Sequence, residues 1–201
     1  MKQRAPMPSS EIAFGFDKRV RKALLPYRET PPVKAVSWLS QAGDQMQVRV
    51  LAGGLIVLGA ARRNPRMIGA GLRMLAAHEV AALAKDWVKR RVVRSRPRSA
   101  TSDGSKKPRP GHDTRKEKSS FPSGHAAGAT AAARAFSAVY PEHAGAAGLA
   151  AGAIALGRIP GCAHYPSDVA AGAAIGAGSA SAVTGIWRLA RLGATAALRR
   201  G

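Results

Sequence analysis

A short stretch of the chain, Pro122-Ser123-Gly124-His125, has the residue types of a phosphate-binding turn. It joins a long basic loop to an Ala/Gly run that is predicted to be helical from residue 124 to about residue 140. The first N–H groups of a helix have no partners within the helix, and the helix dipole favours an anion beside them. Glycine lets the backbone approach such a ligand closely. The stretch therefore predicts a phosphate beside His125, although, taken alone, it also fits a plain turn with a solvated histidine.

Two cations lie upstream of this stretch at a spacing that suits phosphate oxygens. Lys89 is followed, after six residues, by Arg96-Pro97. Seven positions make two helical turns, so the spacing predicts Lys89 and Arg96 on one face of a helix that Pro97 ends. An ammonium and a guanidinium directed at the same place can clamp phosphate oxygens. A solvated cationic helix end is the alternative interpretation.

A histidine and an aspartate lie downstream at a helical spacing. Arg158 is followed after five residues by His164, and His164 after three by Asp168. Pro166 suits the first turn of a helix, and the i, i+4 separation then brings Asp168 towards the imidazole of His164. A carboxylate bonded to one ring nitrogen fixes the tautomer and leaves the other nitrogen free as a base or nucleophile. A satisfied His/Asp pair in a loop is the alternative interpretation.

The composition of the chain predicts an anionic partner. Of the 201 residues, 32 are Lys or Arg and 11 are Asp or Glu, a formal net charge of +21 that suits nucleic acid, anionic lipid headgroups or a phosphorylated substrate. Aromatic residues make up only 5%, which disfavours a base-stacking surface, so no nucleic-acid partner is expected. The single cysteine, Cys162, cannot form an intrachain disulfide, and no zinc-type Cys/His spacing occurs. Residues 1–10 contain no apolar core, so a cleavable secretory signal is not expected.

The apolar residues are gathered into runs, although the mean hydropathy of the chain is only −0.12. This distribution predicts an all-α fold, a multi-pass transmembrane helical bundle of five or six helices with the active site at the membrane surface. The predicted crossings are residues 50–61, 67–93, 124–140, 144–157 and 169–187. Close helix packing in lipid is supported by three Gly-x-x-x-Gly pairs, Gly124/Gly128, Gly148/Gly152 and Gly172/Gly176. His78 and Glu79, in the second crossing, are interpreted as packing or pairing groups. A soluble Ala/Gly-rich bundle is the alternative.

Three parts are predicted along the chain. Residues 1–47 form a basic N-terminal region, in which residues 11–25 fit a basic amphipathic helix on a headgroup surface or an ordinary surface helix. Residues 48–187 form the membrane-embedded domain, with a long basic loop at 94–121 whose residues 100–117 are expected to be disordered. Residues 188–201 form a basic C-terminal tail. The apolar piece at 33–40 is too short for a sixth crossing.

Together the three motifs resemble those of the type 2 phosphatidic acid phosphatase superfamily, which run Lys-x6-Arg-Pro, Pro-Ser-Gly-His and Ser-Arg-x5-His-x3-Asp. Their order and internal spacing agree throughout. The matching residues are Lys89, Arg96, Pro97, Pro122, Ser123, Gly124, His125, Arg158, His164 and Asp168. The chain departs from the pattern at Gly157, where the family usually has a serine that would contact phosphate. It also has five predicted crossings, whereas the family's membrane enzymes typically have six.

The resemblance implies an integral-membrane lipid phosphatase, a phosphoric monoester or diphosphate hydrolase that needs no metal or cofactor. His164 would attack phosphorus and form a phosphohistidine, Asp168 would orient it, and His125 would protonate the leaving alkoxide. The phosphate oxygens would be held by Lys89, Arg96, Arg158 and the amides of Ser123 and Gly124. The implied substrate is a lipid phosphate in the membrane, of the phosphatidate, phosphatidylglycerophosphate or polyprenyl (pyro)phosphate type. The oligomeric state stays open.

Two other classes of function also stay open. The family resembles vanadate-dependent haloperoxidases and soluble acid phosphatases, which the lack of an export signal and the bunched apolar residues disfavour. A non-enzymatic basic membrane protein that binds anionic lipid or nucleic acid would explain the charge, but not the order of His125, Arg158, His164 and Asp168. The side of the membrane is open too, because the resemblance favours an extracytoplasmic site while the Lys/Arg excess on the face of the site favours the cytoplasm.

Overall fold

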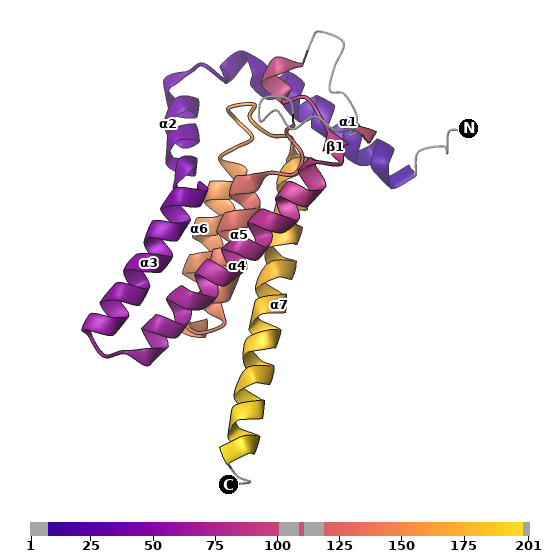
Figure 1. The fold of residues 1–201 in the computed structure, drawn as a ribbon. Coiled ribbons are helices and arrows are strands. Elements are labelled where there is room, and N and C mark those ends of the chain that lie inside the picture. The colour runs from indigo at the N-terminus through magenta and orange to yellow at the C-terminus, as the bar shows by residue number, and fades with distance from the viewer. Residues whose placement is uncertain (1–7, 101–108, 111–118, 199–201) are drawn as a thin grey trace.

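The computed structural model describes residues 8–100, 109–110 and 119–198 (Figure 1). In this part of the chain the predicted all-α fold is confirmed. The α-helices are α1 (Pro8–Leu24), α2 (Pro31–Leu39), α3 (Gln45–Ala61), α4 (Pro65–Lys89), α5 (Gly124–Ser137), α6 (Ala144–Leu156) and α7 (Pro166–Leu198). Short 3₁₀ helices are η1 (Leu25–Tyr27), η2 (Ser40–Gly43), η3 (Pro97–Ser99) and η4 (Pro141–His143). The strands β1 (Val92–Val93) and β2 (Arg109–Pro110) pair in an antiparallel manner.

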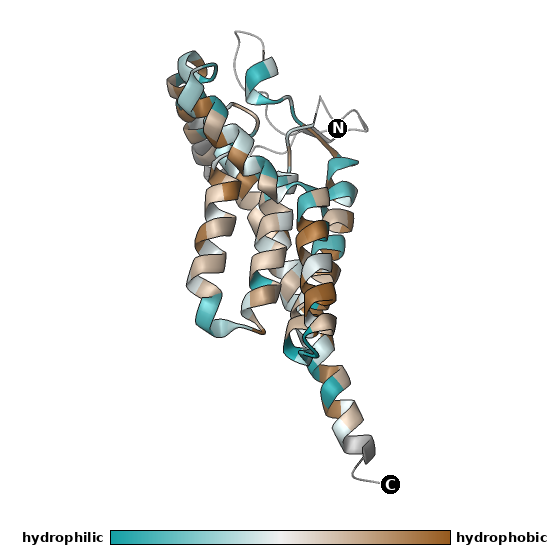
Figure 2. Ribbon diagram, turned by 90° about the vertical axis from the view of Figure 1, so that its left-hand side faces the viewer, coloured by the Kyte–Doolittle hydropathy of each residue, from teal (hydrophilic) through white to brown (hydrophobic). Residues whose placement is uncertain are grey.

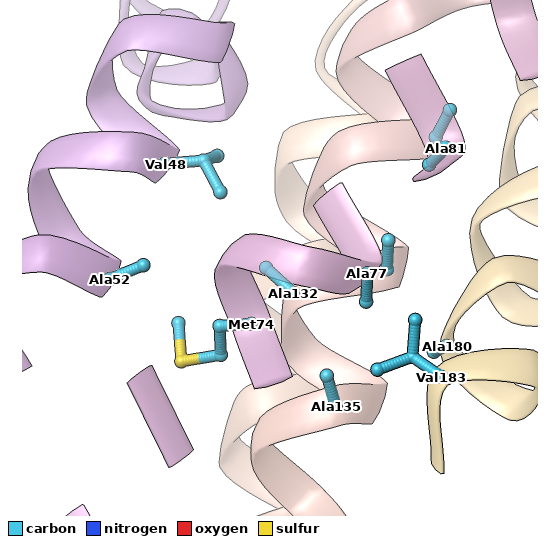
Figure 3. Packing of buried hydrophobic residues seen from close by; sticks show 11 residues of the cluster. Val48, Ala52, Met74, Ala77, Ala81, Ala132, Ala135, Ala180 and Val183 are labelled. Atoms are coloured by element: carbon cyan, nitrogen blue, oxygen red, sulfur yellow. The ribbon is translucent and has the colours of Figure 1, made fainter. Parts of the chain in front are cut away.

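Helices α3 to α7 form a bundle in which the chain reverses direction at each connection (Figure 1). Helix α1 lies across one end of the bundle, and α7 projects beyond the other end. The core consists mainly of alanines, which allow the helices to approach closely (Figure 3). Its labelled members in Figure 3 are Val48, Ala52, Met74, Ala77, Ala81, Ala132, Ala135, Ala180 and Val183.

Two of the three predicted glycine pairs lie at close helix contacts. A side chain at Gly172 would overlap the carbonyl oxygen of the residue that caps α5, and one at Gly176 would overlap a carbonyl oxygen within α5. A side chain at Gly128 would lie 2.9 Å from the ring of His78 on α4. The third pair, Gly148 and Gly152, has no neighbouring atom within 4 Å of an added Cβ. The prediction is therefore wrong for that pair, because α6 packs on the bundle through another face.

The connection between α3 and α4 follows from its capping residues. The side chain of Asp44 accepts from the N–H of Gln45 at the start of α3, and that of Asn64 accepts from Met67 at the start of α4. Pro65 occupies the first position of α4, where its missing N–H has no cost. The two helices are also joined by an ion pair with two hydrogen bonds, of 2.6 and 2.8 Å, from Arg49 to Glu79. This confirms the interpretation of Glu79 as a pairing group.

Several predicted helix ends differ from the structure by a few residues, and two of the differences have a clear physical cause. Helix α4 ends at Lys89 rather than near residue 93, because Val92 and Val93 are β-branched residues that pair with β2 instead. Helix α7 continues to Leu198, through most of the segment predicted as a tail. Its Ala, Leu and Arg residues have high helix propensity, which explains the extension. Most of the predicted disordered segment, 100–117, lies outside the described residues, but the prediction is wrong at Arg109–Pro110, which form β2.

Among the described helices, α4 and α7 are long and apolar enough to span a membrane, and α3 is apolar but has 17 residues. Helices α5 and α6 have 14 and 13 residues, which at about 1.5 Å per residue is short of a hydrocarbon core of about 30 Å. The length criterion thus identifies two of the five predicted crossings. Helix α2, with 9 residues, is too short to be a sixth, as expected.

Candidate active site

A cavity of about 550 Å³ lies at the end of the bundle where α4 ends and α5 begins. Most of the predicted site residues line it, namely Lys89, Arg96, Gly124, His125, Arg158 and His164. The two others, Ser123 and Asp168, lie behind its wall with no exposed surface. The fold therefore brings the three separate motifs to one place.

His164 lies in the loop between α6 and α7 and is 3% exposed. Its Nδ1 lies 2.8 Å from the backbone carbonyl oxygen of Ser120. Because a carbonyl oxygen can only accept, we place the proton of the neutral ring on Nδ1, which leaves the lone pair of Nε2 free. Burial is the largest cause that lowers the pKa of His164 below the ordinary 6.5, so the ring is neutral at neutral pH. The site therefore presents an imidazole that can act as a nucleophile.

Asp168 lies close to His164 without a hydrogen bond to it. Its Oδ2 is 3.8 Å from Nδ1 of His164, which is too long for a hydrogen bond, and it accepts the backbone N–H of Tyr165 at 2.9 Å. The bond predicted between Asp168 and the ring is thus made by the nearer carbonyl of Ser120 instead. The carboxylate still places a negative charge beside the imidazole.

The turn before His164 and Ser120, whose carbonyl contacts the His164 ring, are both bonded to the segment that follows α4. The N–H of Arg98 donates to the carbonyl of Cys162 at 3.1 Å, and the N–H of Ser120 donates to the carbonyl of Arg94 at 2.7 Å. Cys162 has a φ of 50°, a left-handed conformation that is uncommon outside glycine, so this turn has a defined shape. These contacts fix where the ring of His164 points.

The side chain of Ser123 caps the start of α5, and its N–H, which was predicted to bind phosphate, already has a partner. The hydroxyl of Ser123 accepts from the N–H of Ala126 at 3.4 Å. The N–H of Ser123 donates to the carbonyl of Asp168 at 3.0 Å. The prediction that the Ser123 amide holds phosphate is therefore wrong, since this N–H points to α7. Gly124 and His125, the first residues of α5, line the cavity and begin a helix whose first N–H groups have no partners within it.

The predicted cations meet at the cavity, but not on one helix face. Arg96 follows β1 in an extended backbone with φ −67° and ψ 150°, beyond the end of α4 at Lys89. The prediction of a shared helix face is therefore wrong, because the chain leaves the helix before Arg96. Burial first, and then the charges of Arg98 and Arg158, lower the pKa of Arg96 from its ordinary value. A bound anion would relieve this crowding of positive charge.

Lys85 is a further cation of the cavity that the sequence analysis missed as a site residue. It lies one turn before Lys89 on α4, is 8% exposed, and pairs with Asp86 at 2.8 Å. A Cβ added at Gly124 would lie 3.2 Å from Cδ of Lys85, so this side chain reaches the start of α5. The only available signal was its i, i+4 spacing from Lys89.

Ser40 fills the space left by Gly157, where the resembled motif has a serine. A Cβ at Gly157 would lie 2.9 Å from Cβ of Ser40. Ser40 begins η2, is 2% exposed, and accepts a hydrogen bond from Nη1 of Arg158 at 3.2 Å. A hydroxyl from the N-terminal region thus holds Arg158 from 118 residues away in the sequence.

The close contact between Ser40 and Gly157 predicts that a smaller residue at one position makes room for a larger residue at the other. Gly157→Ser is expected to lower the melting temperature in detergent, because the new side chain overlaps Ser40. The double variant Ser40→Gly/Gly157→Ser is expected to regain most of that loss. Ser40→Ala is expected to weaken binding of inorganic phosphate about fivefold, since one hydrogen bond contributes about 1 kcal/mol. A double variant no more stable than Gly157→Ser would contradict the compensation.

Among the described residues, no group of three His, Cys, Asp or Glu side chains gathers as ligands of a metal ion would. The basic loop also contains lysine or arginine at positions 106, 107, 115, 116 and 118, which lie outside the described part of the chain.

A family model described as the PAP2 superfamily matches residues 70–191, which is more than half of the 201 residues. The match includes every predicted site residue and leaves out α1, α2 and α3. The comparisons with curated proteins and with solved structures return no match.

Proposed function

Because the chain belongs to the PAP2 superfamily, we propose that it is an integral-membrane lipid phosphatase that hydrolyses a phosphomonoester or pyrophosphate of a lipid. Membership in the family supports phosphatase activity on phosphoester substrates. The observation that carries the proposal is the shared cavity of His125, His164, Lys89, Arg96 and Arg158. A cavity with two histidines and several cations suits a phosphoryl group, whose charge is spread over three equatorial oxygens during transfer.

The proposed reaction has two steps. When the anionic phosphate binds, it favours the protonated form of His125, which takes up a proton. In the first step, Nε2 of His164 attacks phosphorus in line, the bond from phosphorus to the ester oxygen breaks, and His125 gives that proton to the leaving oxygen. In the second, water attacks the phosphohistidine, His125 takes a proton from that water, and inorganic phosphate leaves. Lys89, Arg96 and Arg158 stabilise the oxygens in both steps. Asp168 stabilises the positive charge that His164 acquires.

Exposed apolar side chains along the bundle support a location in the membrane. Val57 on α3, Leu83 on α4 and Leu149 on α6 are 70%, 69% and 78% exposed. Large exposed apolar areas are unusual for a soluble monomer, whereas lipid would cover them. In Figure 2, white and brown residues run along the bundle, and teal bands appear on the projecting end of α7. Trp38 and Trp87, also exposed, suit a position at a membrane interface.

The proposal predicts phosphate release by the purified protein from a panel of lipid phosphates. The panel contains phosphatidate, phosphatidylglycerophosphate and a polyprenyl pyrophosphate in detergent micelles, with free phosphate as the readout. Release is expected from at least one of them, to persist in EDTA, and to be inhibited by vanadate, which mimics the trigonal-bipyramidal phosphoryl group. Absence of release from every member, or a strict need for Mg²⁺, would contradict the proposal. Binding of anionic vesicles without any release would favour the non-enzymatic alternative.

A further inference from the structure

A carboxylate of the N-terminal helix α1 lies buried beside the active site. Asp17 is 1% exposed, whereas the other side chains described in α1 are partly or fully exposed. It is also the only acidic residue between positions 13 and 24, where several Lys and Arg residues occur. Burying an ionised carboxylate is unfavourable unless it is paired, so its partners indicate what it does.

Asp17 binds Arg94 and the start of α7. Its Oδ2 accepts from Nη2 of Arg94 at 2.6 Å and from the hydroxyl of Ser167, and its Oδ1 accepts the backbone N–H of Ser167 at 3.1 Å. Arg94 is itself 1% exposed, and its guanidinium lies 4.0 Å from the ring centroid of Tyr165. This is a fully formed buried ion pair rather than a surface contact.

The same arginine also binds the aspartate of the third motif. Nη1 of Arg94 donates to Oδ1 of Asp168 at 2.5 Å, and the other oxygen of Asp168 lies 3.8 Å from Nδ1 of His164. Two carboxylates share one guanidinium, so one negative charge remains beside the imidazole. Without Asp17, Arg94 and Asp168 would form a neutral pair, and that negative charge would be lost.

We propose that Asp17 is a positioning residue of the active site, which acts through Arg94 and Asp168 on His164. The inference rests on the proposed function, in which His164 becomes positively charged when Nε2 bonds to phosphorus. A fixed negative charge in a buried setting stabilises that state more than it would in water. Helix α1, which lies outside the matched residues 70–191, is then part of the catalytic structure.

A second attachment of α1 provides a matched control. Nε of Arg21 donates to the carbonyl of Pro97, and Nη2 donates to the carbonyl of Ala100, both at 2.9 Å. Like the bond from Asp17 to Arg94, these bonds hold α1 to the segment that follows β1. They contact backbone carbonyls only, so their loss leaves the charges at Asp168 and His164 unchanged.

The test compares Asp17→Asn, which keeps the shape and removes the charge, with Arg21→Gln. Asp17→Asn is expected to lower kcat for phosphate release about tenfold and to leave KM within about twofold, because the charge acts after the substrate has bound. Arg21→Gln is expected to keep kcat within about twofold of the wild type. Melting temperatures in detergent show how far each variant is destabilised. Equal losses of kcat in the two variants would mean that α1 acts only by docking, and would overturn the proposal.

The effect of the Asp17 charge on His164 can also be measured without an activity assay, by NMR titration of labelled histidines. The charged and titratable groups that face His164 are unchanged in this variant: Lys89 from α4, Arg96 from the segment after β1, His125 from α5 and Asp168 from α7. Asp17→Asn is expected to lower the pKa of His164, because a lost negative charge disfavours the imidazolium. An unchanged or raised pKa would overturn the proposal.

Asp17→Glu separates charge from shape. It is expected to leave the pKa of His164 close to that of the wild type and to retain more of kcat than Asp17→Asn. If Asp17→Asn does not fold, a lowered pKa in Asp17→Glu by itself overturns the proposal. A wild-type protein that releases no phosphate from any lipid phosphate would count against the proposed function, whereas the pKa comparison would still decide the role of Asp17.

Discussion

Replacement of His164 by alanine is expected to lower phosphate release by at least about 10²-fold, because it removes the proposed nucleophile, whose Nε2 is free. The cavity prepares this ring in two ways. The carbonyl oxygen of Ser120 lies 2.8 Å from Nδ1 of His164 and accepts its proton, and burial lowers the pKa of His164 so that the ring is neutral. The cations that remain in the variant are expected to bind phosphate, so substrate affinity is expected to survive the loss of turnover.

Trapping of the intermediate measures this directly. Brief mixing with a labelled lipid phosphate, followed by quenching in alkali, is expected to leave label on the wild-type protein and none on His164→Ala, since a phosphohistidine is stable to alkali and labile to acid. His143→Ala is the matched control, because His143 is an exposed histidine of η4 outside the cavity. Label retained by His164→Ala would remove the nucleophile role from this residue.

Most of the site residues predicted from the sequence line the cavity, because the motifs that contain them are local. The His164 to Asp168 spacing spans one helical turn, and Pro166 begins α7 as predicted. The contacts that orient these residues, in contrast, join positions that are far apart in the sequence. Asp17 lies 77 residues from Arg94, and Ser40 lies 118 residues from Arg158. No spacing rule relates such positions, since only the packing of α1 and η2 against the bundle brings them together.

The errors in the predicted helices have a similar origin. The face shared by Lys89 and Arg96 was inferred from helical periodicity, which assumes that the helix continues. Pairing of β1 with β2 ends it at Lys89, and β2 is contributed by the long loop. The Ser123 amide was inferred from its place at a helix start, but the carbonyl of Asp168 takes its proton. In each case a hydrogen bond to a distant part of the chain replaces the arrangement that local spacing predicts.

The second large effect concerns His125. His125→Ala is expected to lower phosphate release from a lipid phosphate by at least about 10²-fold, because the alkoxide that leaves is a strong base and needs a proton as the bond breaks. With a nitrophenyl phosphate, whose leaving group is a weak base, the same variant is expected to recover most of its rate. His164→Ala is expected to recover nothing, since the nucleophile is needed for both substrates.

The comparison therefore assigns the two roles separately. Both variants and the wild type are assayed on both substrates, and the ratio of the two rates is the quantity of interest. The position of His125 at the start of α5, on the wall of the cavity that also holds His164 and Arg158, is what places it beside the leaving oxygen in the proposed reaction. Equal losses on the two substrates for His125→Ala would mean that it positions phosphate rather than donating a proton. If His164→Ala alone recovered its rate on nitrophenyl phosphate, His164 would be the proton donor and His125 the nucleophile.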